Sequence, residues 1–279
     1  MKYLIGLFLV LTMGVASAAD TKLTWHGHAT FSVVTPSGKV LVIDPWFKGN
    51  PKNPNGKSDN PYQGVEHVDF ILLTHAHPDH VADVTPLGKK TGASLVTNYD
   101  LGNQMVKLMG YPKEKASIMT LMNIGGQIAI ADGEVTVAMT EAKHSSGLAN
   151  PFAGDSEDAP ATVYAGNPGG FVLRIKDGPT IYHTGDTSYF SDMKLIGEMY
   201  EPDIALLSVG DKFTMGMTAG AMAAKVIGAK VSVPQHWGTF PVLAQDPGPF
   251  VAALDNAGME SYVMEPGETL TFSGSNLRK

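Results

Sequence analysis

The chain has 279 residues, of which 43% are hydrophobic and 17% are charged. This composition is typical of a folded globular protein and excludes an intrinsically disordered, collagen-like or coiled-coil chain. The formal net charge is −7, and only Arg174 and Arg278 are arginines. Proteins that grip phosphate backbones present basic, arginine-rich faces, so we expect no nucleic-acid partner.

The first eighteen residues have the pattern of a secretory signal peptide. Lys2 supplies the positive start, residues 3–15 form an apolar run, and Ala16-Ser17-Ala18 is a cleavage site of the A-x-A kind. The apolar run is shorter than the ~20 residues that a spanning helix needs, and no later segment is longer, so we expect no membrane anchor. The sequence thus predicts a signal peptide at residues 1–18 and a mature folded domain at residues 19–279 that is periplasmic or secreted.

The predicted elements run from a meander of short strands into an alternation of helices and strands. Strands are predicted at residues 23–26, 30–35, 40–43, 70–73, 94–97, 128–130, 135–140, 170–175, 180–183, 204–208 and 230–234, and near Tyr262 and Leu270. Helices are predicted at residues 81–90, 101–109, 191–200, 218–227 and 249–257. Two long loops, 47–64 and 145–161, carry no side-chain pattern that indicates a role. This alternation predicts an α/β protein in which two packed sheets carry helices on their outer faces.

The strongest functional signal is the run THAHPDH at residues 74–80, directly after a predicted buried strand. Alternate residues of an extended segment project to the same side, so His75 and His77 can grip one metal ion. The turn that Pro78 forces brings Asp79 and His80 toward a neighbouring position. The alternative is a polar loop between strand and helix, with Asp79 as the helix N-cap.

Three more candidate ligands follow the ends of predicted strands: His144, Asp186 and His236. A single His or Asp in a loop is usually solvated or a cap, but recurrence at three strand ends predicts a shared site. The chain has no cysteine. For an exported protein this excludes disulfides and thiolate chemistry, so His and carboxylates must hold any metal.

In their order along the chain, these residues resemble the metallo-β-lactamase superfamily. More narrowly, WHGHAT at 25–30, IDP at 43–45, YHTGDT at 182–187 and GDKFTMG at 210–216 are similar to UlaG-like metal-dependent hydrolases, which are related to L-ascorbate-6-phosphate lactonase. The resemblance runs from about residue 22 to about residue 271. It implies an αββα sandwich, two mixed β-sheets flanked by helices, with the site at one edge between the sheets.

The resemblance also implies a ligand set for two divalent metal ions. It assigns His75, His77 and His144 to the first ion, Asp79, His80 and His236 to the second, and Asp186 to a bridge between them. A carboxylate can bridge two ions because it has two oxygens, whereas a neutral imidazole offers one lone pair. The implied catalytic residues are Asp79, His80 and Asp186. Zinc suits a His-rich site, and manganese or iron also accept this donor set.

Other residues have weaker signals. Asp44 is in the superfamily's position for a carboxylate that orients a ligand His, or it caps a turn. His28 is expected to line the pocket, and His183 is either near the site or an ordinary strand residue. Asp211, Lys212 and Thr214 follow the strand predicted at 204–208, and they either touch the substrate or cap the following helix. Trp237 and Phe240 either wall an apolar pocket or belong to the core.

The leading hypothesis is hydrolysis of a small molecule by a hydroxide that bridges two ions, with a lactone, amide or related ester bond as the target. The alternatives are a phosphodiesterase, a β-lactamase-type hydrolase, a mononuclear iron oxygenase on the same fold, and a non-catalytic metal- or ligand-binding protein. Export argues against a sugar-phosphate substrate, because phosphorylated intermediates are cytosolic.

The export hypothesis predicts a mature protein that begins at Ala19, because cleavage follows the small residues at positions 16–18. N-terminal sequencing of protein from an envelope or culture fraction measures this directly. An intact Met1 on a cytosolic protein would contradict it.

Overall fold

The computed structural model of the chain describes residues 19–154 and 158–278. The predicted signal peptide therefore lies outside the described residues. Within the described ranges, no helix has the length and apolar character needed to cross a membrane.

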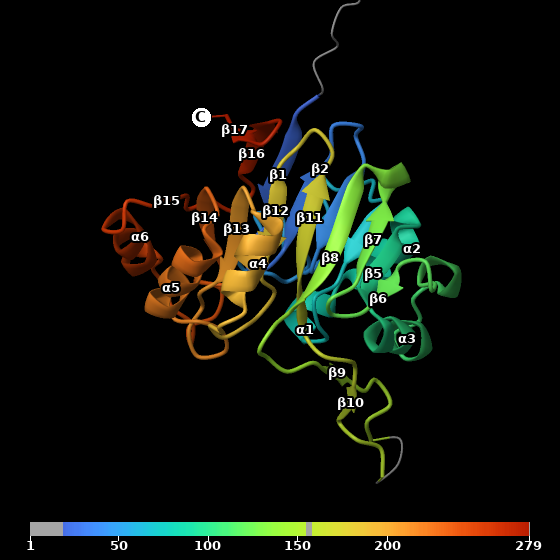
Figure 1. Cartoon of the computed structure of the whole chain (residues 1–279). Helices are drawn as coiled ribbons and strands as arrows, with labels where there is room; N and C mark the ends of the chain where they lie inside the picture. Colours follow the sequence, from blue (N-terminus) through green and yellow to red (C-terminus); the bar gives the residue numbers. More distant parts are fainter. Residues whose placement is uncertain (1–18, 155–157, 279) are drawn as a thin grey trace, which may run out of the picture.

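Two mixed β-sheets pack face to face (Figure 1). The eight-stranded sheet has the order β17-β16-β1-β2-β3-β4-β5-β6 and the seven-stranded sheet the order β15-β14-β13-β12-β11-β8-β7. The first sheet contains β1 (Thr21–Trp25), β2 (Phe31–Val34), β3 (Val40–Ile43), β4 (Phe70–Leu72), β5 (Ser94–Asn98), β6 (Leu121–Met122), β16 (Thr269–Ser273) and β17 (Asn276–Leu277). The second contains β7 (Gln127–Ile130), β8 (Val135–Glu141), β11 (Gly169–Ile175), β12 (Thr180–His183), β13 (Ile204–Ser208), β14 (Val231–Gln235) and β15 (Glu260–Ser261).

Helices cover the outer face of each sheet. The first sheet carries α2 (Val84–Thr91) and α3 (Tyr99–Lys107), whose apolar residues join those of β4 and β5 in one buried cluster. The second sheet carries α4 (Met193–Tyr200), α5 (Met217–Ile227) and α6 (Gly248–Asp255) in another. A third cluster, with Trp25, Phe31, Phe171 and Leu206, fills the space between the sheets. The αββα sandwich predicted from the sequence is confirmed.

Strand sequences account for this layering. In β11, Phe171 and Leu173 belong to the cluster between the sheets, whereas Val172 belongs to the cluster under the helices. This is the two-residue alternation of a strand. β13 is buried along its whole length, as expected of a parallel strand covered on both faces.

The helix predicted at residues 81–90 is instead two helices, α1 (Pro78–Val81) and α2. Pro78 occupies the first turn of α1, where a missing N–H costs nothing, and His77 is the N-cap, so the alternative of Asp79 as N-cap is wrong. Asp83 separates the helices. Its carboxylate accepts hydrogen bonds from the backbone of Phe47 and from the Tyr62 hydroxyl, at 2.6 and 2.8 Å, and so anchors the 47–64 loop.

A small hairpin lies in the segment predicted as the 145–161 loop and just beyond it. It consists of β9 (Gly147–Ala149) and β10 (Thr162–Tyr164), and it extends away from the sandwich (Figure 1). The short 3₁₀ helices Lys113–Lys115 and Ala131–Gly133 complete the elements. Strands β3, β4, β8, β12 and β14 all end close to α1, and the chain segments that leave them carry the candidate ligands.

Candidate metal centre

Three histidine nitrogens converge beside α1. His75 Nε2 lies 3.0 Å from His77 Nδ1, and His144 Nε2 lies 3.1 Å from the same atom. Nitrogens bound tetrahedrally to one zinc ion at 2.0–2.1 Å would be about 3.3 Å apart. Three lone pairs at this spacing are therefore placed to share a cation.

A second group gathers beside the first. His28, Asp79, His80 and His236 each offer a donor atom, and these atoms lie within 4.8 Å of one another. Nε2 of His236 is 3.8 Å from Asp79 Oδ2, and Nε2 of His80 is 3.9 Å from Asp79 Oδ1. This spacing leaves room for an ion between the side chains.

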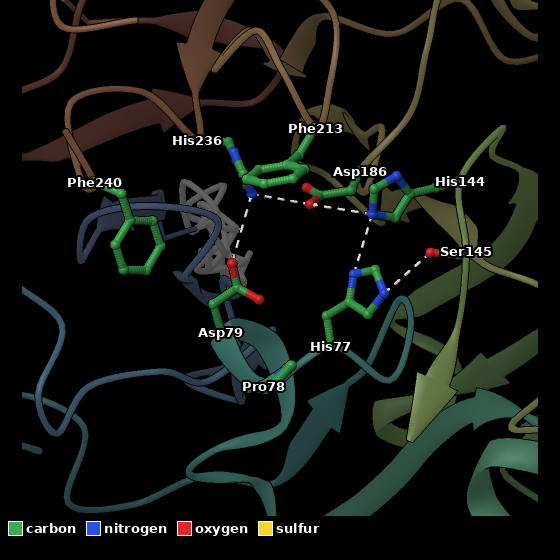
Figure 2. A pocket seen from close by; sticks show the side chains of 9 residues that line it. All are labelled: His77, Pro78, Asp79, His144, Ser145, Asp186, Phe213, His236 and Phe240. Atoms are coloured by element: carbon green, nitrogen blue, oxygen red, sulfur yellow. Dashed lines mark hydrogen bonds and ion pairs between the residues drawn. The ribbon is translucent and has the colours of Figure 1, made fainter. Parts of the chain in front are cut away.

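Asp186 lies between the two groups (Figure 2). Its Oδ2 is 2.9 Å from His236 Nε2 and 3.3 Å from His80 Nε2, both in the second group. The same oxygen is 3.8 Å from His144 Nε2 and 3.9 Å from His75 Nε2, both in the first. One carboxylate thus reaches both groups.

The donor set fits divalent ions. His80 Nε2 and Asp186 Oδ1 are buried and make no well-aligned hydrogen bond. Buried polar atoms normally have partners, because leaving one unpaired costs about 1–3 kcal/mol. Cations between these atoms would supply the missing partners, and imidazole with carboxylate is a donor combination that zinc, iron and manganese accept.

The protonation states of most of these groups also suit metal binding. Burial and the neighbouring His80 lower the pKa of His75 well below its usual value. Burial opposes ionisation of Asp186, but His236 and His80 outweigh it and hold the pKa of this carboxyl well below its usual value. In His80 burial lowers the pKa, whereas Asp186 and Asp44 outweigh it and raise the pKa well above normal. A metal ion would therefore displace a proton from His80.

Asp44 holds two of the histidines in place. Its fully buried carboxylate accepts hydrogen bonds from the backbone N–H and the hydroxyl of Thr74, at 2.8 and 2.6 Å. His80 Nδ1 lies 2.8 Å from the same carboxylate, and the Thr74 hydroxyl lies 3.0 Å from His75 Nδ1. Asp44 thus fixes the ring of His80 directly and that of His75 through Thr74. Such contacts orient the nitrogen that faces the metal.

His28 lies behind the pocket, not on its surface. The ring is fully buried, with Nε2 2.9 Å from Asp79 Oδ2 and Nδ1 2.9 Å from the Thr239 hydroxyl. Its centroid is 3.8 Å from that of His236. Burial and His236 lower the pKa of His28 to about 4, so the neutral ring donates one hydrogen bond and accepts another.

His183 is outside the cluster. Its Nδ1 accepts a hydrogen bond from the Gly185 N–H, and its Nε2 lies 3.0 Å from the Ala29 carbonyl oxygen. It supports the turn that presents Asp186. Gly185 in that turn has a φ of +60°, and a Cβ there would lie 2.3 Å from the Gly169 carbonyl oxygen, so a glycine is required.

Asp211 and Thr214 do not line the pocket, and they do not cap α5, whose N-cap is Gly216. Thr214 Oγ1 accepts a hydrogen bond from the Gly210 N–H at 2.9 Å, and Asp211 is exposed. Both belong to the turn that carries Phe213.

A pocket of about 360 Å³ opens over the cluster (Figure 2). Its lining residues are His77, Pro78, Asp79, His144, Ser145, Asp186, Phe213, His236 and Phe240. Sequence reasoning missed Ser145 and Phe213. Ser145 Oγ lies 3.2 Å from His77 Nε2, and its position next to His144 was the available signal. Phe213 lies within the GDKFTMG motif, and its aromatic ring was the available signal.

Residues 39–237 match the family model of the β-lactamase superfamily domain. The chain belongs to this family. It is 48% identical to a UPF0173 metal-dependent hydrolase of Thermodesulfovibrio yellowstonii, over 87% of this chain and 88% of the relative. A UPF0173 metal-dependent hydrolase of Anaeromyxobacter sp. (strain K) is 44% identical, over 92% and 89%.

A solved structure is also similar: Igni18, a metallo hydrolase of Ignicoccus hospitalis. It has 34% sequence identity and a TM-score of 0.75, over 91% of this chain and 99% of that chain. The protein is thus a metal-dependent hydrolase of the metallo-β-lactamase fold.

Replacing Asp44 by Asn removes the charge that holds Thr74 and His80. We expect Asp44→Asn to weaken metal binding about 10–100-fold, as for other groups that orient ligand histidines. Calorimetric titration of the metal-free protein with Zn²⁺ measures the change.

The matched control is Asp203→Asn. Asp203 is also buried and accepts a backbone hydrogen bond, from Thr180 at 2.7 Å, but it is absent from the metal-binding groups. Equal losses of affinity in both variants would show that Asp44 acts through general stability.

Proposed function

We propose that the protein uses two divalent metal ions to hydrolyse a lactone, amide or related ester bond of a small molecule. The supporting observation is the position of Asp186, one of whose two carboxylate oxygens, Oδ2, lies within 3.9 Å of imidazole nitrogens from both groups. His75, His77 and His144 would hold the first ion, and Asp79, His80 and His236 the second. Zinc is the ion we favour, with manganese or iron as alternatives.

Asp186 has an electrostatic role in this proposal. Two dications a few ångströms apart repel each other, and a buried carboxylate between them offsets the repulsion. Its side chain is only 3% exposed, so water screens its charge little. Ions bound there would activate a water molecule and polarise the carbonyl oxygen of the substrate.

Asp79 is the more open carboxylate, with 23% of its side chain exposed, and it lines the pocket. It is placed to take a proton from the attacking water and pass it to the leaving oxygen or nitrogen. Water adds to the carbonyl carbon, the bond to the leaving atom breaks, and that atom gains the proton. A lactone would give the open hydroxy acid. His28, 2.9 Å from Asp79 Oδ2, keeps this carboxylate oriented.

We further propose that this reaction takes place outside the cytoplasm, after removal of residues 1–18. The positive start, the apolar run and the A-x-A site support this. The reaction class is tested by turnover of the zinc-loaded protein on lactone, phosphodiester, thioester and β-lactam substrates. Turnover of phosphodiesters alone would contradict the proposed acyl chemistry, and a single iron with O₂-dependent turnover would favour the oxygenase.

Asp186→Asn keeps the shape of the side chain and removes its charge. We expect the variant to lose the second ion and to lower turnover by at least about 100-fold, because uncompensated repulsion between the ions remains. Metal analysis after equilibration with zinc, together with lactone turnover, measures both effects.

Asp211→Asn is the control, because Asp211 follows a neighbouring strand but is exposed and outside the cluster. Two ions held as tightly by Asp186→Asn as by the wild type would contradict the bridging role.

A further inference from the structure

Aromatic side chains form two walls of the pocket over the metal-binding residues. Phe240 lies on the side of Asp79, opposite His144 and Ser145, and Phe213 lies beside His236 (Figure 2). Phe240 stacks on Trp46, with ring centroids 5.6 Å apart and planes 18° from parallel. Phe213 is 54% exposed and Phe240 36% exposed. Large apolar rings left open beside a reaction site indicate an apolar ligand.

The position of Phe213 is fixed by a strained turn. Asp211 and Lys212 just before it have φ angles of +61° and +41°, which cost residues other than glycine about 1 kcal/mol or more each. The turn persists because its ends are tied down. Gly210 N–H donates to Thr214 Oγ1 at 2.9 Å, and Met215 N–H donates to the Thr187 carbonyl oxygen at 3.0 Å. Thr187 is next to Asp186, so the phenyl ring is held in register with the metal-binding residues.

The loop that carries Phe240 is tied to the same turn. Ala244 N–H donates to the Gly210 carbonyl oxygen at 2.8 Å, and Gly238 N–H donates to the Ala244 carbonyl oxygen at 2.8 Å. The Gln245 side chain donates to the Phe240 carbonyl oxygen at 2.8 Å. Both rings are thus placed by backbone that is hydrogen-bonded to itself and to the strand ends that carry Asp186 and His236. They form a preorganised surface.

The pocket lining offers an anionic substituent at its aromatic end no lysine or arginine partner. None of the lining residues found in the described part of the chain is Lys or Arg. The lysines nearby make other contacts: Lys212 Nζ lies 5.5 Å from the Phe213 ring centroid, Lys52 Nζ lies 4.6 Å from that of Trp237, and Lys143 pairs with Glu141. A phosphate at the aromatic end would lose hydration without finding a lysine or arginine among the lining residues, which is costly.

We infer that the pocket selects an uncharged acyl substrate whose part away from the reacting bond is a flat apolar group. Phe213 and Phe240 are the residues that determine this preference, and a phosphorylated substrate is disfavoured. The inference rests on the proposed hydrolytic function and narrows its substrate class.

Two γ-lactones that differ only in the substituent on the γ carbon test the preference. We expect the zinc-loaded protein to hydrolyse γ-phenyl-γ-butyrolactone at least about tenfold better, in kcat/KM, than γ-(phosphonooxymethyl)-γ-butyrolactone. Phe213→Ala and Phe240→Ala should each lower kcat/KM for the phenyl lactone about tenfold. Both variants should have the same kcat/KM as the wild type for the phosphorylated lactone.

Phe152→Ala is the matched control, because Phe152 is exposed to nearly the same extent as Phe213, 52%, but does not line the pocket. Its kcat/KM should equal that of the wild type. A preference for the phosphorylated lactone that disappears in Lys212→Ala would overturn the inference, and so would unchanged values in both pocket variants.

Binding of a ketone that cannot be hydrolysed separates this inference from the proposed function. We expect calorimetry to show that 3-phenylcyclopentanone binds the zinc-loaded protein, and that Phe213→Ala and Phe240→Ala each weaken binding about tenfold. This result without turnover of either lactone would support the inference and contradict lactone hydrolysis. Absence of ketone binding, or equal binding by wild type and both variants, would overturn the inference whatever the turnover.

Discussion

The contact of one carboxylate oxygen with histidines from both halves of the sandwich is the interaction on which the site depends. Asp186 follows β12 in the second sheet. Its Oδ2 lies within 3.9 Å of the Nε2 atoms of His75 and His80, which follow β4 in the first sheet. It also meets His144 and His236 from its own sheet. So many lone pairs gathered in a buried space form a stable arrangement when cations lie among them. The architecture can therefore be understood as a frame for metal binding.

The frame fixes these side chains through backbone conformations that are unusual for non-glycine residues. His28, Asp44 and His236 all have φ angles in the left-handed region, at +56°, +47° and +66°. Strain of this kind persists where the surroundings determine the backbone, and it gathers at functional sites. Gly210 shows how tight the packing is, because a Cβ there would lie 2.2 Å from the His236 carbonyl oxygen. The site is thus shaped by its backbone as well as by its ligands.

The sequence predicted the sandwich, and the structure gathers the candidate ligands in one cluster, because both depend largely on patterns that are local in the sequence. Two-residue alternation in β11 and the HxHxDH run next to a buried strand are visible without coordinates. The division of α1 from α2 was missed because it depends on a contact between distant segments. The Asp83 carboxylate accepts hydrogen bonds from the Phe47 backbone N–H and the Tyr62 hydroxyl. The position of His28 behind Asp79 depends on the same kind of long-range packing. The β9–β10 hairpin was missed because its short strands lack a strong apolar pattern.

Anomalous X-ray diffraction at the zinc edge, from crystals of the zinc-loaded protein, tests the central claim most directly. The account predicts two peaks, one among His75, His77 and His144 and the other among Asp79, His80 and His236, with Asp186 in contact with both. A single peak, or two peaks of which only one contacts Asp186, would contradict the dinuclear centre.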